Sequence, residues 1–170
     1  MRDEDQRALE QFVAERGDRL LRTAALLAGS RDAGEDLLQS ALERLLRNRR
    51  RIDGDPEAYV RRTLYNLAVD GWRRQRLWQR KAVLTDPGPP ADLTSAVDLR
   101  DAVIRMLAQV PPRQRAILVL RYFEELSEAE TAQALGCSVG AVKSATSRGL
   151  ARLRESTASG NKLEAHALKE

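Results

Sequence analysis

A proline-rich stretch at residues 85–92, with the sequence TDPGPPAD, constrains the fold of this chain more than any other feature. Proline has no backbone N–H to donate and disfavours helix in the residue before it, so this stretch is expected to be extended and exposed. The sequence on either side is rich in apolar residues. It therefore predicts two small domains, residues 5–81 and 96–156, with a linker at 82–95 and a tail at 157–170.

The apolar residues on both sides repeat with the period of a helix, and nowhere do they alternate over the length of a strand. Aromatic residues make up only 4% of the chain, and Leu, Ala and Val supply most of its apolar content, which favours helices. The chain is therefore expected to be all-α. Helices are predicted at 5–28, 32–47, 56–80, 96–110, 112–125, 127–135 and 139–154.

Local signals mark where several of these helices begin and end. Gly29 is expected to close the first helix in a left-handed conformation. Asp32 and Glu35 have the spacing of a capping box for the second helix, and Asp55 before Pro56 is typical of the start of the third. The second helix carries a wide apolar stripe that should face the core: Leu37, Leu38, Ala41, Leu42, Leu45 and Leu46.

Residues 127–154 have the layout of a helix-turn-helix that reads DNA. Ser127 and Glu130 form another capping box. Gly136 stands where the chain must turn sharply, and glycine takes a positive φ at little cost. The residues expected to fill the angle between the two helices are Ala132, Leu135, Cys137, Val142 and Ala145. In this position Cys137 is interpreted as a small buried hydrophobe, with a redox sensor as the alternative.

The second helix of this motif is cationic, since its Lys and Arg residues face no acid anywhere between 139 and 154. Interspersed hydroxyl side chains suit contacts with phosphates or base edges. Cations on an exposed helix often serve solubility alone, but here they lie on the helix that would read DNA. The residues predicted to contact DNA are Ser138, Lys143, Ser144, Thr146, Ser147 and Arg148.

A second basic segment lies at residues 60–81, where many Lys and Arg residues accompany a single acid, Asp70, and are interleaved with aromatic rings. Cations beside aromatic rings suit a nucleic acid with unstacked bases, because the cations hold phosphates while the rings stack. The alternative is that Tyr65, Val69 and Trp72, at helical spacing, belong to the core. The preceding loop, 47–55, is also basic, although a solvated loop would have the same composition.

Composition excludes several classes of function. The net charge of +4 suits a polyanionic partner. One His and one Cys cannot by themselves build a metal site, and the sequence has no Gly-rich phosphate loop or carboxylate cluster, so we expect no catalytic residues, no metal and no cofactor. No segment approaches the roughly 20 apolar residues that span a bilayer, and the start lacks a secretion signal, so we expect a cytoplasmic protein without a membrane partner.

Four segments, in this order, resemble the extracytoplasmic-function (ECF) sigma factors of the sigma-70 family, of actinobacterial type, with regions 2 and 4 only. Asp32–Leu46 resembles the polymerase-binding helix of region 2. Glu57–Asp70, followed by Trp72–Arg74, is similar to the promoter-melting segment. Val110–Ser127 is similar to the start of region 4, and Glu130–Ser144 to its helix-turn-helix. The resemblance covers roughly residues 8–155.

The resemblance implies an initiation factor that is not itself an enzyme. Such a factor binds core RNA polymerase, recognises the −35 and −10 promoter elements and enables promoter opening. The implied partners are promoter DNA, the clamp helices of the largest polymerase subunit and the flap of the second-largest, with an anti-sigma factor as a possible further partner. The cationic residues of the helix-turn-helix then contact the −35 element. The family often has Arg where Ala145 stands, which implies that one DNA contact is missing.

By the same resemblance, the loop 47–55 and the basic aromatic helix lie against the −10 element, and the exposed side of the second helix binds polymerase. The residues implied for the −10 element are Asn48, Arg49, Arg50, Tyr59, Arg62, Asn66, Arg73 and Arg74. Those implied for polymerase are Asp36, Gln39, Glu43 and Arg44.

Three other functions account for the sequence less well. An ordinary helix-turn-helix repressor or activator would explain residues 127–154 but not the basic aromatic helix. An enzyme acting on nucleic acid would need chemistry that the sequence lacks. A helical adaptor would have no use for two cationic surfaces.

Overall fold

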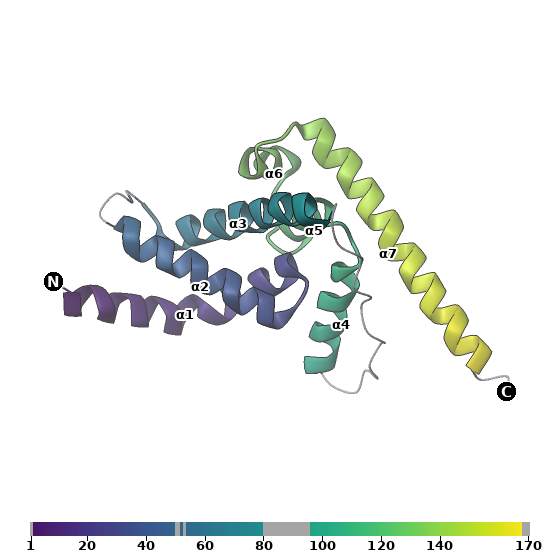
Figure 1. The fold of residues 1–170 in the computed structure, drawn as a ribbon, viewed down its shortest axis with the longest axis horizontal. Coiled ribbons are helices and arrows are strands. Elements are labelled where there is room, and N and C mark those ends of the chain that lie inside the picture. The colour runs from purple at the N-terminus through teal and green to yellow at the C-terminus, as the bar shows by residue number, and fades with distance from the viewer. Residues whose placement is uncertain (1, 50–51, 53, 80–95, 168–170) are drawn as a thin grey trace.

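The computed structural model describes residues 2–49, 52, 54–79 and 96–167, and the predicted linker at 82–95 lies outside this description. All regular structure in the described parts is helical, which confirms the all-α prediction (Figure 1). The helices are α1 (Arg2–Ala28), α2 (Arg31–Asn48), α3 (Pro56–Gln79), α4 (Ala96–Ala108), α5 (Pro112–Tyr122), α6 (Glu128–Leu135) and α7 (Val139–Ala167). We call α1–α3 the N-terminal half and α4–α7 the C-terminal half.

The ends of the first two helices were predicted only in part. Gly29 has φ +85° and closes α1, as expected. The capping box predicted at Asp32 and Glu35 is wrong, because Ser30 caps α2 instead: its hydroxyl accepts a hydrogen bond from the Ala33 N–H at 3.2 Å. Ser30 directly follows the glycine turn, so its extended backbone already has the conformation that an N-cap requires. The Asp55 cap of α3 is confirmed, since its carboxylate accepts from the Glu57 N–H at 3.0 Å.

Two helices of the C-terminal half end elsewhere than predicted. The predicted end of α5 at 125 is wrong, because the chain leaves the helix after Tyr122 and Glu125 adopts a left-handed φ of +56°. The predicted end of α7 near 154 is also wrong, because the helix continues to Ala167. No proline follows Ser138, and the Ala, Leu, Lys and Glu residues of this segment favour helix.

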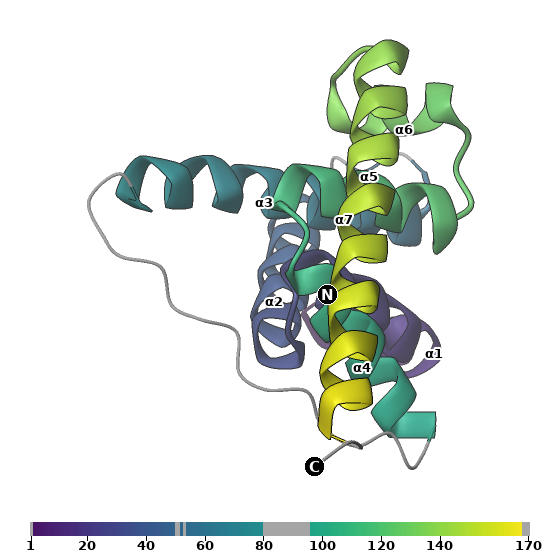
Figure 2. The ribbon, with the colours of Figure 1, turned by 90° about the vertical axis from the view of Figure 1, so that its right-hand side faces the viewer.

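The helices lie in three tiers (Figures 1 and 2). α3 and α5 lie in the middle, α1, α2 and α4 on one side of them, and α6 with the start of α7 on the other. The C-terminal half thus packs directly on the N-terminal half, through α5 against α1 and α3, through α4 against α1, and through α6 against α3.

One apolar core extends through both halves. It joins Leu20, Leu27 and Leu64 of the N-terminal half to Leu107 and Leu118 of the C-terminal half. The stripe predicted on α2 faces this core through Leu38, Ala41 and Leu45, which are buried. Leu46 departs from the prediction, because it lies at the edge of the stripe and is 43% exposed.

Arg115 of α5 ties together the ends of two other helices. Its side chain is buried, and its guanidinium donates to the carbonyls of Leu27 at 3.3 Å, Ala108 at 3.2 Å and Val110 at 3.2 Å. Carbonyls at helix C-termini have no partner within the helix, and a cation there also interacts favourably with the helix dipole. Burial lowers the pKa of Arg115 below its ordinary value. A Cβ on Gly29 would lie 2.4 Å from the Arg115 Nη1 atom, so this glycine also makes room for the guanidinium.

Candidate nucleic-acid interface

A hollow of about 590 Å³ lies between the C-terminal end of α2 and the N-terminal half of α3. Its volume is within the range of about 300–1,000 Å³ that is typical of small-ligand sites. Its polar walls come from residues three, four or seven positions apart on each helix, a spacing that places them on one face. The lining residues are Arg44, Arg47, Asn48, Tyr59, Arg62, Thr63 and Asn66.

Hydrogen bonds hold the floor of this hollow in place. The side-chain amide of Asn48 donates to the Tyr59 hydroxyl at 3.1 Å and lies 3.0 Å from the carbonyl of Arg44. The Thr63 hydroxyl donates to the carbonyl of Tyr59 at 2.8 Å. The ring of Tyr59 is half-buried, whereas Arg62 and Asn66 are exposed at the rim. The hollow therefore offers an aromatic ring, amide groups and guanidinium groups within reach of one small planar ligand.

The structure brings together four of the residues predicted for the −10 element: Asn48, Tyr59, Arg62 and Asn66. Arg49 is exposed but lines a different hollow, between α1 and α2, with Phe12 and Pro56. Arg50 lies outside the described residues, and Arg73 and Arg74 belong to α3, but their side chains lie outside the description as well.

Three further residues of the hollow were not predicted for it. Arg44, which was predicted to contact polymerase, also lines the hollow. Arg47 and Thr63 lie in segments predicted to face the −10 element but were not named as contacts, although their spacing from Asn48 and Tyr59 along the two helices could have identified them.

The alternative interpretation of the aromatic residues, that they belong to the core, is confirmed for Tyr65, which is 4% exposed. Burial raises the pKa of its hydroxyl, and the neighbouring Glu124 carboxylate raises it further.

The helix-turn-helix forms as predicted. Ser127 accepts from the Glu130 N–H at 3.2 Å and its own N–H donates to the Glu130 carboxylate at 2.8 Å, which completes the capping box. Gly136 has φ +61°. The Ser138 hydroxyl accepts from the Ala141 N–H at 3.1 Å and caps α7. The angle between α6 and α7 is filled by Ala132, Val142 and Ala145, with Leu135, Cys137 and Ile117 of α5 packed around them.

The exposed face of α7 carries most of the residues predicted for DNA. Lys143, Ser144, Ser147 and Arg148 are exposed, as is Ser138 at the start of the helix. Lys143 Nζ lies 3.6 Å from the Glu128 carboxylate of α6, and Arg148 Nε donates to the carbonyl of Ser144 at 3.3 Å.

Burial at two positions on α7 bears on the predicted DNA surface. The Thr146 hydroxyl is buried, so this residue does not present it on the exposed face. Ala145 is buried against α6, and a longer side chain there would have to enter the core of the motif. Ala145 thus packs within the motif, and the missing DNA contact expected at this position stays a prediction.

The side of α2 that faces away from the core carries the other predicted set. Asp36, Gln39 and Glu43 are exposed. The Gln39 amide donates to Glu43 at 3.4 Å, and Glu43 pairs with Arg47 at 3.1 Å. This row of polar side chains leads along α2 to the edge of the hollow.

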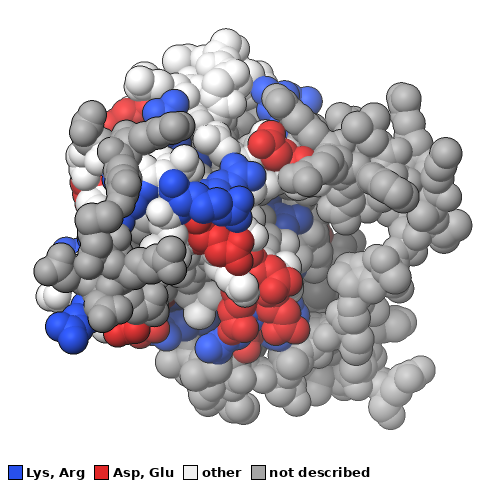
Figure 3. Space-filling view, turned by 60° about the vertical axis from the view of Figure 1, so that its left-hand side comes forward, with Lys and Arg blue, Asp and Glu red and all other residues white. Residues whose placement is uncertain are grey.

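Positive and negative side chains form small separate groups on the described surface, and neither sign covers a whole face. Figure 3 shows one face on which a compact group of Lys and Arg side chains lies directly above a group of Asp and Glu side chains. The net charge of +4 is thus less informative than the position of individual cations in the hollow and on α7.

Comparison with known proteins identifies the family. The Sigma-70 region 2 model matches residues 12–77, and the Sigma-70 region 4 model matches residues 100–153. The RNA polymerase sigma-E factor of Streptomyces coelicolor is 38% identical over 148 residues, covering 86% of this chain and 84% of that protein. The ECF RNA polymerase sigma factor SigM of Mycobacterium tuberculosis is 33% identical over 151 residues, covering 88% and 76%. The chain belongs to the sigma-70 family, in its ECF group.

As an ECF sigma factor, the protein acts in promoter recognition and transcription initiation. Sigma factors of this family work with core RNA polymerase and promoter DNA and are initiation factors. The fold agrees: the sigma factor RpoE, solved in complex with the anti-sigma factor NepR from Bartonella quintana, matches with a TM-score of 0.64 and 23% identity. That match covers 86% of this ECF sigma factor and 94% of RpoE.

Within the part of the chain that the structure describes, no helix is both long enough and apolar enough to cross a membrane.

Proposed function

We propose that the hollow between α2 and α3 receives an unpaired base of the −10 element while the promoter opens. The observation that carries this proposal is the combination of Tyr59, Asn48 and Arg62 around one open hollow. Removing a base from the duplex costs a few kcal/mol, and stacking on an aromatic ring returns about 1–3 kcal/mol per base. Amides at the rim can distinguish base edges by their donors and acceptors.

The exposed face of α7 is proposed to read the −35 element in the major groove. In a helix-turn-helix the second helix enters this groove, and here its N-terminal turns carry Ser138, Lys143, Ser144, Ser147 and Arg148. Lys143 and Arg148 supply charge for phosphates or guanine edges, and the serines supply short hydrogen-bonding groups. Thr146 is left out of this surface, because its hydroxyl is buried.

Polymerase is proposed to dock on the exposed row of α2. Asp36, Gln39 and Glu43 present acid and amide groups there, and the match to region 2 supports the clamp helices of the largest subunit as the partner. The C-terminal half would then lie near the flap of the second-largest subunit. RpoE was solved with an anti-sigma factor, which supports an anti-sigma factor as a further partner for this chain.

Substitutions at the rim of the hollow test the first part of the proposal. With core polymerase and a cognate promoter, Asn66→Ala and Arg62→Ala should each lower the yield of open promoter about tenfold, the equivalent of ~1.4 kcal/mol. Permanganate reactivity of unpaired thymines in the −10 element measures this yield. Arg7→Ala is the matched control, because Arg7 is an exposed arginine of α1 away from the hollow.

If the hollow captures an unpaired base, a template that is already single-stranded across the −10 element should restore much of the opening-dependent transcription of both variants. Unchanged permanganate reactivity in Asn66→Ala and Arg62→Ala would contradict the assignment.

A further inference from the structure

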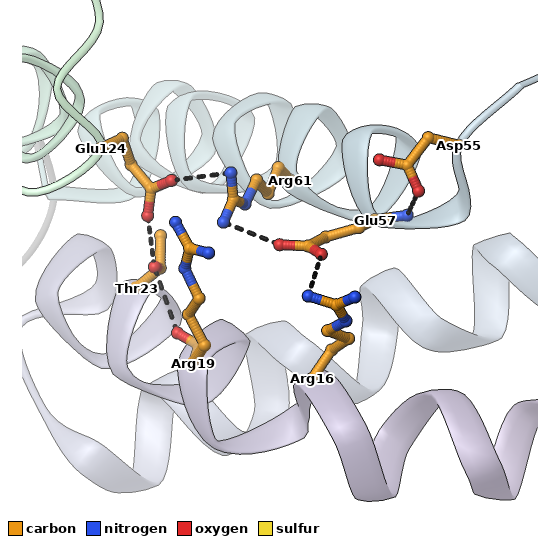
Figure 4. A network of polar contacts seen from close by, with 7 residues as sticks. All are labelled: Arg16, Arg19, Thr23, Asp55, Glu57, Arg61 and Glu124. Atoms are coloured by element: carbon orange, nitrogen blue, oxygen red, sulfur yellow. Dashed lines mark hydrogen bonds and ion pairs between the residues drawn. The ribbon is translucent and has the colours of Figure 1, made fainter.

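Glu124, directly after α5, joins the two halves of the molecule. Its side chain is only 4% exposed. One carboxylate oxygen accepts a hydrogen bond from the Thr23 hydroxyl of α1 at 2.5 Å, and the other lies 3.4 Å from Arg61 Nη1 of α3 (Figure 4). A single carboxylate of the C-terminal half thus contacts two helices of the N-terminal half.

The contact is part of a longer polar network across the N-terminal half. Arg61 also pairs with Glu57 at 2.7 Å, and Glu57 lies 3.5 Å from Arg16 of α1 (Figure 4). This network holds Arg61 in place, so that its guanidinium is already oriented toward Glu124. Arg115 makes a second polar tie between the halves, through the carbonyl of Leu27 at the end of α1.

In this arrangement the two DNA-reading surfaces are too close to occupy both promoter elements. The −35 and −10 elements are about 25 base pairs apart, and at ~3.4 Å per base pair this separation is ~85 Å along duplex DNA. Here α6 of the helix-turn-helix packs against α3, which carries the hollow. The chain between Gln79 and Ala96 can span ~60 Å when fully extended. A linker of this length lets the halves move well apart, but the contacts at Glu124 and Arg115 and the shared apolar packing must break before they do so.

We propose that Glu124, with Thr23 and Arg61, is an intramolecular latch that holds the sigma factor in a closed state unable to read a complete promoter. This inference rests on the proposed function of α7 and the hollow. Core polymerase selects the open state, so the fraction of open molecules limits the apparent affinity for polymerase.

The packing around Glu124 suits a contact that must open. A hollow of about 420 Å³ lies beside it, between α1, α4 and the end of α5, and is lined by Thr23, Leu26, Val103, Phe123 and Glu124 itself. Phe123 remains 48% exposed at its edge. The halves are therefore incompletely packed here, and the polar groups of the latch can exchange their partners for water when the halves part.

The test measures the distance between the halves in the full chain. In a Cys137→Ala background, spin labels are attached at Ala33→Cys in α2 and Ala151→Cys in α7, both exposed positions outside the proposed DNA surfaces. Double electron–electron resonance then compares the unaltered latch with Glu124→Gln and with Thr23→Val. Glu125→Gln is the matched control, since it makes the same change at the adjacent exposed carboxylate.

We expect one narrow distance distribution for the unaltered latch. Glu124→Gln and Thr23→Val should each add a longer distance and raise the ratio of open to closed molecules about tenfold, with a matching gain in polymerase affinity. The double variant should open further than either single variant, because Glu124→Gln weakens the ion pair with Arg61 and Thr23→Val removes the hydrogen bond from Thr23. Glu125→Gln should leave the distribution unchanged.

Identical distributions in all variants would overturn the latch, as would a broad distribution with the latch intact. If Glu124→Gln fails to fold, the smaller change Thr23→Val decides the question. Transcription with the unaltered chain distinguishes a failure of the latch from a failure of the proposed function. If initiation is normal but the variants leave the distances between the spin labels unchanged, only the latch is rejected. A response of the distances without any initiation rejects the proposed function and, with it, the role assigned to the latch.

Discussion

At the scale of single residues, side-chain hydrogen bonds set where α2 and α6 begin and hold the end of α1. The capping box of Ser127 and Glu130 depends only on residues three positions apart, and it forms as predicted. The box expected at Asp32 and Glu35 competes with Ser30, which wins because the glycine turn places it first. The contacts of Arg115 with Leu27 join residues 88 positions apart, and no local pattern indicates them.

The capping box makes one part of the stability depend on pH. The hydrogen bonds with Ser127 hold the pKa of the Glu130 carboxyl below its ordinary value of 4.5. A lowered pKa in the folded state means that the carboxylate stabilises the fold above pH ~4.5, and that this stabilisation is lost as the pH falls through the folded pKa.

Glu130→Gln should therefore melt below the unaltered protein at pH ~6, and the gap should narrow as the pH is lowered to ~3. Thermal unfolding of both proteins, followed by circular dichroism across this range, measures the gap. A gap that is constant with pH would show that the charge of Glu130 plays no part in the cap.

At the scale of elements, the period of the apolar residues predicts the helices, but it does not predict where two helices come closest to each other. Gly34 lies where α2 crosses α1, and a Cβ there would lie 2.6 Å from both the Cα and the N of Ala25. Because these are backbone atoms, the helices themselves would have to move. The sequence shows only a glycine near a helix start, since its neighbour comes from a different helix.

The two glycines of α2 and α3 should respond in opposite ways to alanine. Gly34→Ala should lower the free energy of unfolding by about 2–3 kcal/mol, because it overpacks the crossing of α1 and α2. Gly71 lies in α3 with no atom within 4 Å of its Cβ position. Gly71→Ala should raise the free energy of unfolding by about 0.5–1 kcal/mol, because alanine favours helix over glycine. Urea denaturation measures both, and a stabilising Gly34→Ala would contradict the close approach.

At the scale of the whole molecule, the sequence indicated two helical domains and their order, but not their contact. The proline-rich stretch predicts a division, and the matches to region 2 and region 4 lie on either side of it. The structure adds that the halves share one apolar core and the Glu124 contact. These contacts depend on complementary surfaces of α1, α3 and α5, which appear only after each helix has formed.

The packing of α2 against α3 explains why the sequence predicted the candidate site only in part. Residues 44–48 and 59–66 each carry a recognisable row of polar and basic side chains. Their meeting in one hollow requires α2 and α3 to lie antiparallel beside each other, which joins Arg44 to Asn66. The sequence therefore did not show that Arg44, Arg47 and Thr63 line the same hollow as Asn48 and Tyr59.

The central claim is that the two DNA surfaces recognise a promoter only when core polymerase holds them apart. Run-off transcription from a cognate promoter tests it most directly, alongside binding of the same DNA without polymerase. We expect transcripts from the chain with core polymerase, none from core polymerase alone, and a clear loss with Lys143→Ala and Arg148→Ala. Tight binding of the isolated chain to the promoter, near 10⁻⁸ M as for an ordinary regulator, with no transcript when core polymerase is added, would contradict the account.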